Sequence, residues 1–220
     1  KLVQGKFKRV APLAAISAYS EVALHALNEA TFNPENLKRA LEGAVAQAQR
    51  AGKSLHELLA FLQKGELVTA QFELNHVVQE ALNIAKGDGY GGFNPLLELE
   101  PALPKVIGNE IQVRKILVNL LRNAVEAMRG AGVPSSAILI TVRTNQEINM
   151  AHVTVQDSGP GLDAETAKHI FEPFFTTKPT GIGMGLAISR ALTEANGGQL
   201  WLEQNKKPGA TFHFTLPFAT

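Results

Sequence analysis

The 220-residue sequence contains no cysteine, which excludes disulfide bonds and thiol chemistry. It also lacks any apolar run approaching ~18 residues, so no segment of it is expected to span a bilayer, and it shows no signal peptide. An excess of one charge is missing too: 21 basic residues face 20 acidic ones, and a net charge of +1 argues against broad electrostatic capture of nucleic acid. With 45% apolar residues, the composition is that of a soluble globular protein of one large or two small domains.

Two common nucleotide-binding motifs are absent as well. No Gly-x-x-x-x-Gly-Lys-Ser/Thr occurs, which excludes a P-loop. No Gly-x-Gly-x-x-Gly follows an expected strand, which excludes the dinucleotide-binding fingerprint. Any nucleotide site in this chain must therefore use another arrangement.

The first third of the chain has the apolar periodicity of two helices. Spacings of four and three indicate heptad-like stripes, and Asn33 is a candidate cap for the second helix, with Pro34 at its first position and Gly65 at its end. Two helices alone have too little core, so we expect residues 1–65 to form a helical hairpin that pairs with a second copy into a four-helix bundle, as a homodimer. The stripes comprise Leu13, Ile16, Ser20, Ala23 and Leu27, then Leu37, Leu41, Ala44, Ala48, Ala51, Leu55, Leu58 and Leu62.

The pattern changes near Glu66. Strands are expected at 66–74, 93–100, 137–145, 150–157, 199–205 and 210–217, and helices at 75–87, 109–132 and 185–198, with Asn109 as a cap. A long segment at 158–184 is expected to be poor in regular structure. The chain is thus predicted to be α+β: the hairpin at 1–65, then a two-layer α/β sandwich with a mixed sheet at 66–220.

A glycine-rich stretch, "FFTTKPTGIGMGLAI", precedes the last expected helix. Gly181, Gly183 and Gly185 occupy alternate positions there. Glycines let backbone N–H groups approach phosphate oxygens, and the N-terminus of the following helix adds positive potential. The alternative reading is a plain glycine-rich turn.

Two further polar elements stand out. In "QDSGPGL", Asp157 ends an apolar strand and is followed by Gly159 and Gly161, which suits a carboxylate that binds the amino group of a flat purine, although an Asx turn is the alternative. Asn119 and Asn123 lie four residues apart, hence on one helix face, and amide oxygens there can hold magnesium and face phosphates. Two solvated amides are the alternative.

Taken in order, these elements have a specific resemblance. The Asn-x-x-x-Asn helix, the Asp-x-Gly-x-Gly loop, "FEPF" and Gly-x-Gly-x-Gly resemble the ATP-binding domain of two-component sensor histidine kinases, which belongs with the gyrase, Hsp90 and MutL ATPases. Over residues 66–220 the sequence is most similar to the histidine kinase group that includes the oxygen sensors of nitrogen fixation. The preceding hairpin, with "PLAAISAYSEVAL", resembles the dimerisation and phosphoacceptor domain of that family.

The resemblance implies ATP and Mg²⁺ as cofactors, a cytoplasmic location and a response regulator as partner. It implies that Asn123 is the magnesium ligand, that Asn119 lies near the phosphates, and that the Asp157 carboxylate binds the adenine amino group. The resemblance also implies that Gly159 and Gly161 shape the base pocket, and that Phe171 and Phe174 anchor a lid that carries Thr177 and Lys178. Gly181, Gly183 and Gly185 would wrap the triphosphate, and Thr211 would contact the adenine.

The sequence departs from the family at the phosphoacceptor. Counting back from Pro12, the histidine position holds Phe7 and the acidic position holds Lys8. Either the residues before Pro12 are not the native ones, or the chain is a natural pseudo-acceptor, or another histidine serves; His56 and His25 are interpreted as surface residues. Two functions remain open, a histidine kinase core and a dimeric ATP-binding pseudokinase. A simple ATPase would need an acid in place of Asn119 to activate water.

Overall fold

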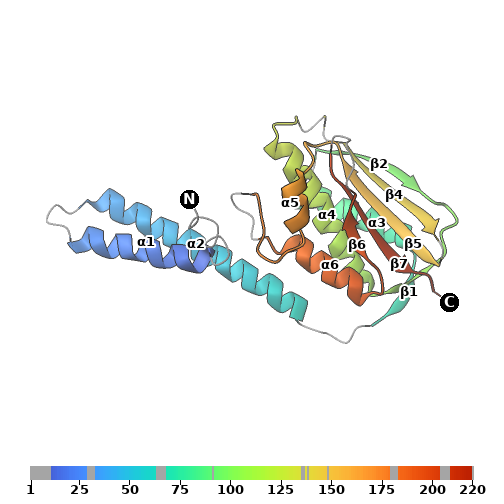
Figure 1. Cartoon of the computed structure of the whole chain (residues 1–220), viewed down its shortest axis with the longest axis horizontal. Coiled ribbons are helices and arrows are strands. Elements are labelled where there is room, and N and C mark those ends of the chain that lie inside the picture. The colour runs from blue at the N-terminus through green and yellow to red at the C-terminus, as the bar shows by residue number, and fades with distance from the viewer. Residues whose placement is uncertain are drawn as a thin grey trace. The chain divides into compact units, whose positions relative to one another are not determined.

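The structure is a computed structural model that describes residues 11–28, 33–62, 68–90, 92–134, 137, 139–147, 149–178, 183–203 and 209–219. The chain falls into two compact units (Figure 1). One comprises Lys1–Lys64 with Phe174–Met184, and the other comprises Gly65–Pro173 with Gly185–Thr220. Within the described residues, no helix combines the length and apolar character needed to cross a membrane.

The first unit contains a pair of packed helices, α1 (Ala11–Asn28) and α2 (Pro34–Leu62). The predicted cap of α2 is confirmed, because the Asn33 side-chain oxygen accepts hydrogen bonds from the backbone N–H groups of the second and third helical residues. Ala23, Ala26 and Ala40 are buried, whereas Leu27 and Leu41 of the predicted stripes are 55% and 50% exposed. One hairpin therefore buries its small residues and leaves large apolar side chains uncovered. Gly65, expected to end α2, lies outside the described residues.

The second unit is built on a five-stranded sheet in the order β2-β4-β5-β7-β6. Strand β2 (Asn94–Leu99) runs parallel to β4 (Leu139–Glu147), and the other pairs are antiparallel, so the predicted mixed sheet is confirmed. The remaining strands are β5 (Met150–Asp157), β6 (Leu200–Leu202) and β7 (Thr211–Pro217). A separate antiparallel pair joins β1 (Ala70–Phe72) to β3 (Val106–Gly108).

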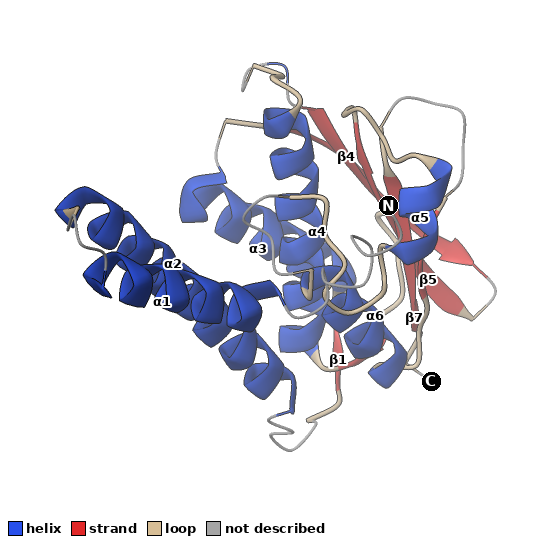
Figure 2. Ribbon diagram, turned by 60° about the vertical axis from the view of Figure 1, so that its left-hand side comes forward, coloured by secondary structure: helices blue, strands red, loops and turns tan. Residues whose placement is uncertain are grey.

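Three helices form the second layer: α3 (Leu74–Ala85), α4 (Glu110–Gly130) and α6 (Gly185–Ala195). They lie against one face of the sheet (Figures 1 and 2). The core between the layers includes the buried apolar side of α4, which contacts β5, and fully buried β7 residues such as Phe214 and Leu216. Asn109 caps α4 as predicted, accepting a hydrogen bond from the Gln112 N–H at 3.0 Å. A π-helical turn (Lys86–Tyr90) follows α3, and its Tyr90 hydroxyl donates to Glu126 of α4 at 2.6 Å.

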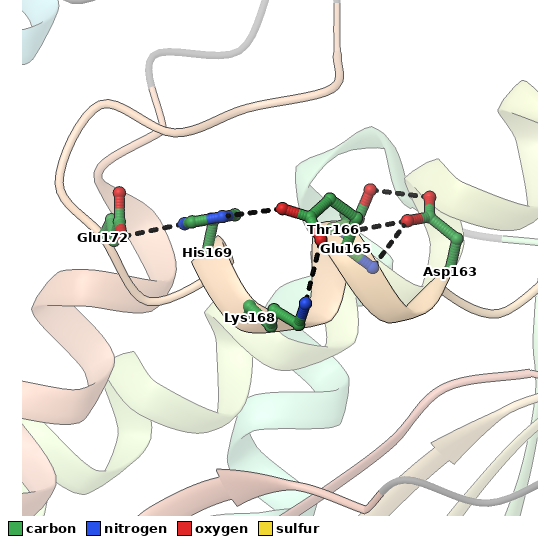
Figure 3. A network of polar contacts seen from close by, with 6 residues as sticks. All are labelled: Asp163, Glu165, Thr166, Lys168, His169 and Glu172. Atoms are coloured by element: carbon green, nitrogen blue, oxygen red, sulfur yellow. Dashed lines mark hydrogen bonds and ion pairs between the residues drawn. The ribbon is translucent and has the colours of Figure 1, made fainter.

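Two elements correct the sequence-based expectations. The segment at 158–184 contains a short helix, α5 (Ala164–His169), capped by Asp163, whose carboxylate accepts hydrogen bonds from the Glu165 and Thr166 N–H groups and from the Thr166 hydroxyl (Figure 3). The prolines nearby favoured the prediction of an irregular segment, but the Asp163 cap starts a helix after Pro160. Strand β3 was not predicted, because its three residues are too few to show a period of two.

The other face of the sheet carries a cluster of two histidines under the single tryptophan. The His152 and His213 rings approach within 2.9 Å between nitrogens, and Trp201 stacks on both, at 5.4 and 5.2 Å between centroids. Glu147 and Glu203 face the outer nitrogens of the two rings, at 2.7 and 3.1 Å. Burial lowers the pKa of His152, and the nearby His213 lowers it further, against the raising effect of Glu147.

This cluster makes the stability of the fold sensitive to acid. A histidine whose folded pKa lies below its ordinary value of 6.5 binds protons more weakly when folded, so its contribution is complete above that pH and is lost as the pH falls through 6.5 toward the folded pKa. We expect His152→Gln to reduce the loss of unfolding free energy between pH 7.5 and 5.5, measured by urea denaturation. His76→Gln, on an exposed position of α3, is the matched control and should keep the wild-type loss. Equal acid sensitivity of His152→Gln and wild type would contradict this assignment.

Candidate nucleotide-binding site

Asp157 ends β5 as a buried carboxylate, only 5% exposed. One oxygen, Oδ1, accepts hydrogen bonds from two backbone N–H groups, those of Gly159 at 2.8 Å and Ala210 at 3.1 Å. Burial raises the pKa of Asp157, and these two hydrogen bonds oppose the rise. Among the described residues Oδ2 has no hydrogen-bond partner, so the second oxygen is available to a donor from a ligand.

Glycines shape the space around this carboxylate. A Cβ added at Gly159 would lie 2.9 Å from Asp157 Oδ1 and 3.2 Å from Met128 of α4. Gly161 has φ +76° and would bring a Cβ within 3.0 Å of the Gly209 carbonyl oxygen, and Gly209 itself has φ +92°. The backbone at Gly159 and Gly161 thus passes close to Asp157 and to Gly209, and the role of these glycines in a base pocket stays a prediction.

Asn119 of α4 lies beside the start of α6. The Asn119 amide donates to the Ser189 hydroxyl at 2.9 Å, and its oxygen is 2.6 Å from the position that a Cβ on Gly185 would occupy. Gly185 thus lets the first turn of α6 approach the α4 amide closely. Asn123 lies one turn further along α4 and is half-buried, so it shares a helix face with Asn119.

Phe171 is held on two sides just after α5. Its ring meets Phe212 of β7 edge to face at 6.5 Å, and the Arg190 guanidinium of α6 lies 5.2 Å from its centroid. The turn before Phe174 is fixed by polar contacts, because His169 bonds Glu172 at 2.8 Å and approaches Glu165 at 3.4 Å (Figure 3). Both contacts raise the pKa of His169, with Glu172 the larger cause.

The segment Phe174–Met184 belongs to the first compact unit. Phe174, 48% exposed, has a left-handed φ of +66°, and its N–H donates to the Gly183 carbonyl at 2.9 Å. A Cβ on Gly183, at φ +73°, would fall 2.4 Å from the Phe175 oxygen, so this position requires glycine. Thr177 is exposed and the Lys178 N–H donates to the Thr176 hydroxyl. Gly181 lies outside the described residues.

The Thr211 side chain lies on the opposite face of the sheet from that of Asp157. It is buried and lies opposite Gln156 in the β5–β7 register, so its side chain alternates to the other face of the sheet. Its adenine contact stays a prediction. The sequence predicts Ala210, whose N–H donates to the carboxylate, only as the start of a strand, and it gives the neighbouring Gly209 no role in the site. Sequence signals for them are weak, because a glycine after proline fits any turn.

Gly209 offers a direct test of this pocket. A Cβ there would lie 1.9 Å from the Asp157 carbonyl oxygen, at a φ that side chains rarely adopt. We expect Gly209→Ala to lower the unfolding free energy by about 3 kcal/mol or more. Gly130→Ala, which places its Cβ in open space, should change it by less than about 1 kcal/mol. Chemical denaturation compares the two, and similar small losses would show that the turn at Gly209 is not constrained.

Comparison with known proteins places this arrangement in a family. Residues 108–220 match the family described as histidine kinase-, DNA gyrase B-, and HSP90-like ATPase. The sensor protein FixL of Bradyrhizobium diazoefficiens is 37% identical over 94% of the chain, which spans 41% of that protein. The chain covers less than half the length of the curated relatives it matches first.

Solved structures of histidine kinases share the fold. The catalytic domain of histidine kinase ThkA is 28% identical, with a TM-score of 0.59 over 68% of this chain and 95% of that domain. Full-length ShkA in complex with AMPPNP matches 95% of this chain and 46% of its own length, with a TM-score of 0.65 at 24% identity. With the buried Asp157, its glycines and the paired asparagines in one unit, the chain belongs to the histidine kinase-, DNA gyrase B- and HSP90-like ATPases, and its similarity within them is to the sensor histidine kinases.

Proposed function

We propose that this chain is the core of a histidine kinase: it binds ATP with magnesium and transfers the γ-phosphoryl group to a histidine, for relay to a response regulator. The observation that carries the nucleotide part is the Asp157 carboxylate, buried with one oxygen held by the backbone and the other directed to no protein donor among the described residues. The backbone hydrogen bonds occupy Oδ1 and leave Oδ2 for a further donor, so the site suits a ligand that brings an N–H. The exocyclic amino group of adenine is such a donor.

The asparagines of α4 fit the polar end of the same ligand. Amide oxygens are ligands that magnesium accepts, and Asn123 would hold the ion while Asn119 faces the phosphates across Gly185. When bound, magnesium supplies charge neutralisation to the triphosphate. The chain's own part is to orient the nucleotide, through Asp157 at the base and the start of α6 at the phosphates, and to admit backbone close to the ligand at Gly185.

The phosphoacceptor decides between two functions. Phe7 stands where the family carries its histidine and lies outside the described residues, as does Lys8. A phenyl ring has no lone pair with which to attack phosphorus, so position 7 cannot be phosphorylated. A dimeric pseudokinase that signals by its nucleotide-dependent conformation is therefore the second candidate, favoured by this residue alone.

The hairpin supports a dimer. Large apolar side chains of both helices are at least half exposed in one copy: Val22, Leu24, Leu27, Leu41 and Val45. An apolar groove on α2 includes Leu37, Leu41 and Val45 among its lining residues. A second hairpin would cover this surface in a four-helix bundle.

The adenine assignment predicts opposite effects on affinity and stability. Asp157→Asn keeps an acceptor for the Gly159 and Ala210 N–H groups but turns the other oxygen into a donor that faces the base, so ATP affinity should fall by about 1.5–3 kcal/mol, measured by calorimetry. Because the pKa of Asp157 is raised in the fold, its contribution to stability is complete below its ordinary value of 3.8 and is lost as pH rises through the folded pKa. At pH 7 the variant should be at least as stable as wild type.

Asp163→Asn is the matched control for this experiment. Asp163 caps α5 through exposed hydrogen bonds, and asparagine is a comparable cap, so the same substitution there should change stability little and leave ATP affinity near the wild-type value. Unchanged affinity in Asp157→Asn would remove the basis of the nucleotide assignment.

The acceptor assignment is tested with labelled ATP and mass spectrometry. The wild-type chain should carry no label at position 7, and Phe7→His combined with Lys8→Glu should acquire acid-labile phosphate there. Adding Asp157→Asn to that double variant should abolish the label. Label on His56 or His25 of the wild type would show that the acceptor has moved. No label after restoration, with ATP binding intact, would favour the pseudokinase.

The dimer is tested on α2. Leu41→Glu with Val45→Glu places two charges on the exposed apolar surface and should halve the mass measured by light scattering at micromolar concentration. Leu41→Met with Val45→Ile keeps the surface apolar and should preserve the dimer. A monomeric wild type would exclude the bundle under these conditions.

A further inference from the structure

Arg190 lies on α6, five residues after Gly185, and points its guanidinium at an aromatic ring. The guanidinium carbon is 5.2 Å from the Phe171 centroid, within the ~6 Å at which a cation is attracted to a ring face. On its other side the Arg190 Nε pairs with Glu194 at 3.2 Å, one turn along the same helix. The ion pair of these half-exposed side chains contributes little by itself, but it limits where the guanidinium can point.

Phe171 connects this contact to the Asp157 pocket. Its ring meets Phe212 at 88°, an edge-to-face geometry favourable for aromatic pairs. Phe212 lies opposite Val155 in the β5–β7 register, so Phe212, Val155 and Asp157 share one face of the sheet. The row Arg190, Phe171 and Phe212 therefore runs from α6, whose first residue, Gly185, lies beside Asn119, to β7. Ala210, just before β7, donates to Asp157.

We propose that Arg190 is a positioning residue for nucleotide binding, which holds Phe171 against Phe212 beside the Asp157 pocket; this rests on the proposed function. Arg190 acts through Phe171 and needs no contact of its own with the ligand. Phe171 lies in the turn after α5, where the Phe212 ring and the Arg190 guanidinium contact its ring. A planar guanidinium stacks on a ring in a way that a neutral amide does not.

The test combines hydrogen exchange with a double-mutant cycle. In the nucleotide-free protein, Arg190→Gln should speed amide exchange in peptides spanning 170–178. It should also weaken ATP binding roughly two- to fivefold, the range for an exposed cation–π contact. Phe171→Leu should weaken binding too, and the double variant should bind no more weakly than Phe171→Leu alone. Lys168→Gln removes a neighbouring charge that pairs only with Glu165 among the described residues and should change neither measurement.

Two results would overturn the proposal. Unchanged exchange in Arg190→Gln would show that Arg190 does not hold Phe171. Additive losses of affinity in the double variant would show that Arg190 acts on the nucleotide by another route. A wild type that binds no ATP overturns the proposed function instead, and the exchange measurement still decides whether Arg190 restrains Phe171.

Discussion

The site depends on one buried negative charge. Asp157 is removed from water at the end of β5, and its carboxylate is tolerable there because the backbone N–H groups of Gly159 and Ala210 both donate to the same oxygen. Those donors come from chain segments on two sides of the strand end. Glycine is needed around these donors because the backbone passes too close to Asp157 to leave room for a Cβ atom. The left-handed turns at Gly161 and Gly209 follow from that requirement.

A second constraint is the close approach of α6 to α4. Asn119 is a poor residue for a helix interior, yet its amide links α4 to Ser189 and faces Gly185. Further along, the Asn196 side chain accepts from the Asn109 N–H at 2.6 Å and donates to Gln112 at 2.8 Å. The two helices that flank the proposed phosphate site are thus joined at two places by side-chain amides, which limits the rotation of α4 against α6.

Much of this could be predicted from local sequence. Asn33 and Asn109 are recognisable as caps because a cap is a hydrogen bond between the Asn side chain and a backbone N–H two or three residues later. The Asp157 loop could be predicted because a carboxylate beside two glycines at a strand end is unusual. Ala210 could not be found in this way, since its role comes from β7 pairing beside β5, 53 residues away in sequence. Helix α5 was missed because six residues show too little periodicity against nearby prolines. The Arg190–Phe171 contact joins separate elements and has no local signal.

The position of β7 bears on how the protein is made. This late strand lies between β5 and β6 in the sheet, and the turn before it supplies one of the two donors to Asp157. During synthesis, β5 and α4, the helix of Asn119 and Asn123, leave the ribosome well before Ala210 does. The growing chain can form α4 and the β4–β5 hairpin early, since these contacts are near in sequence, but it cannot complete the carboxylate pocket. The proposed nucleotide pocket therefore waits for β7, which is made after every other strand of the sheet.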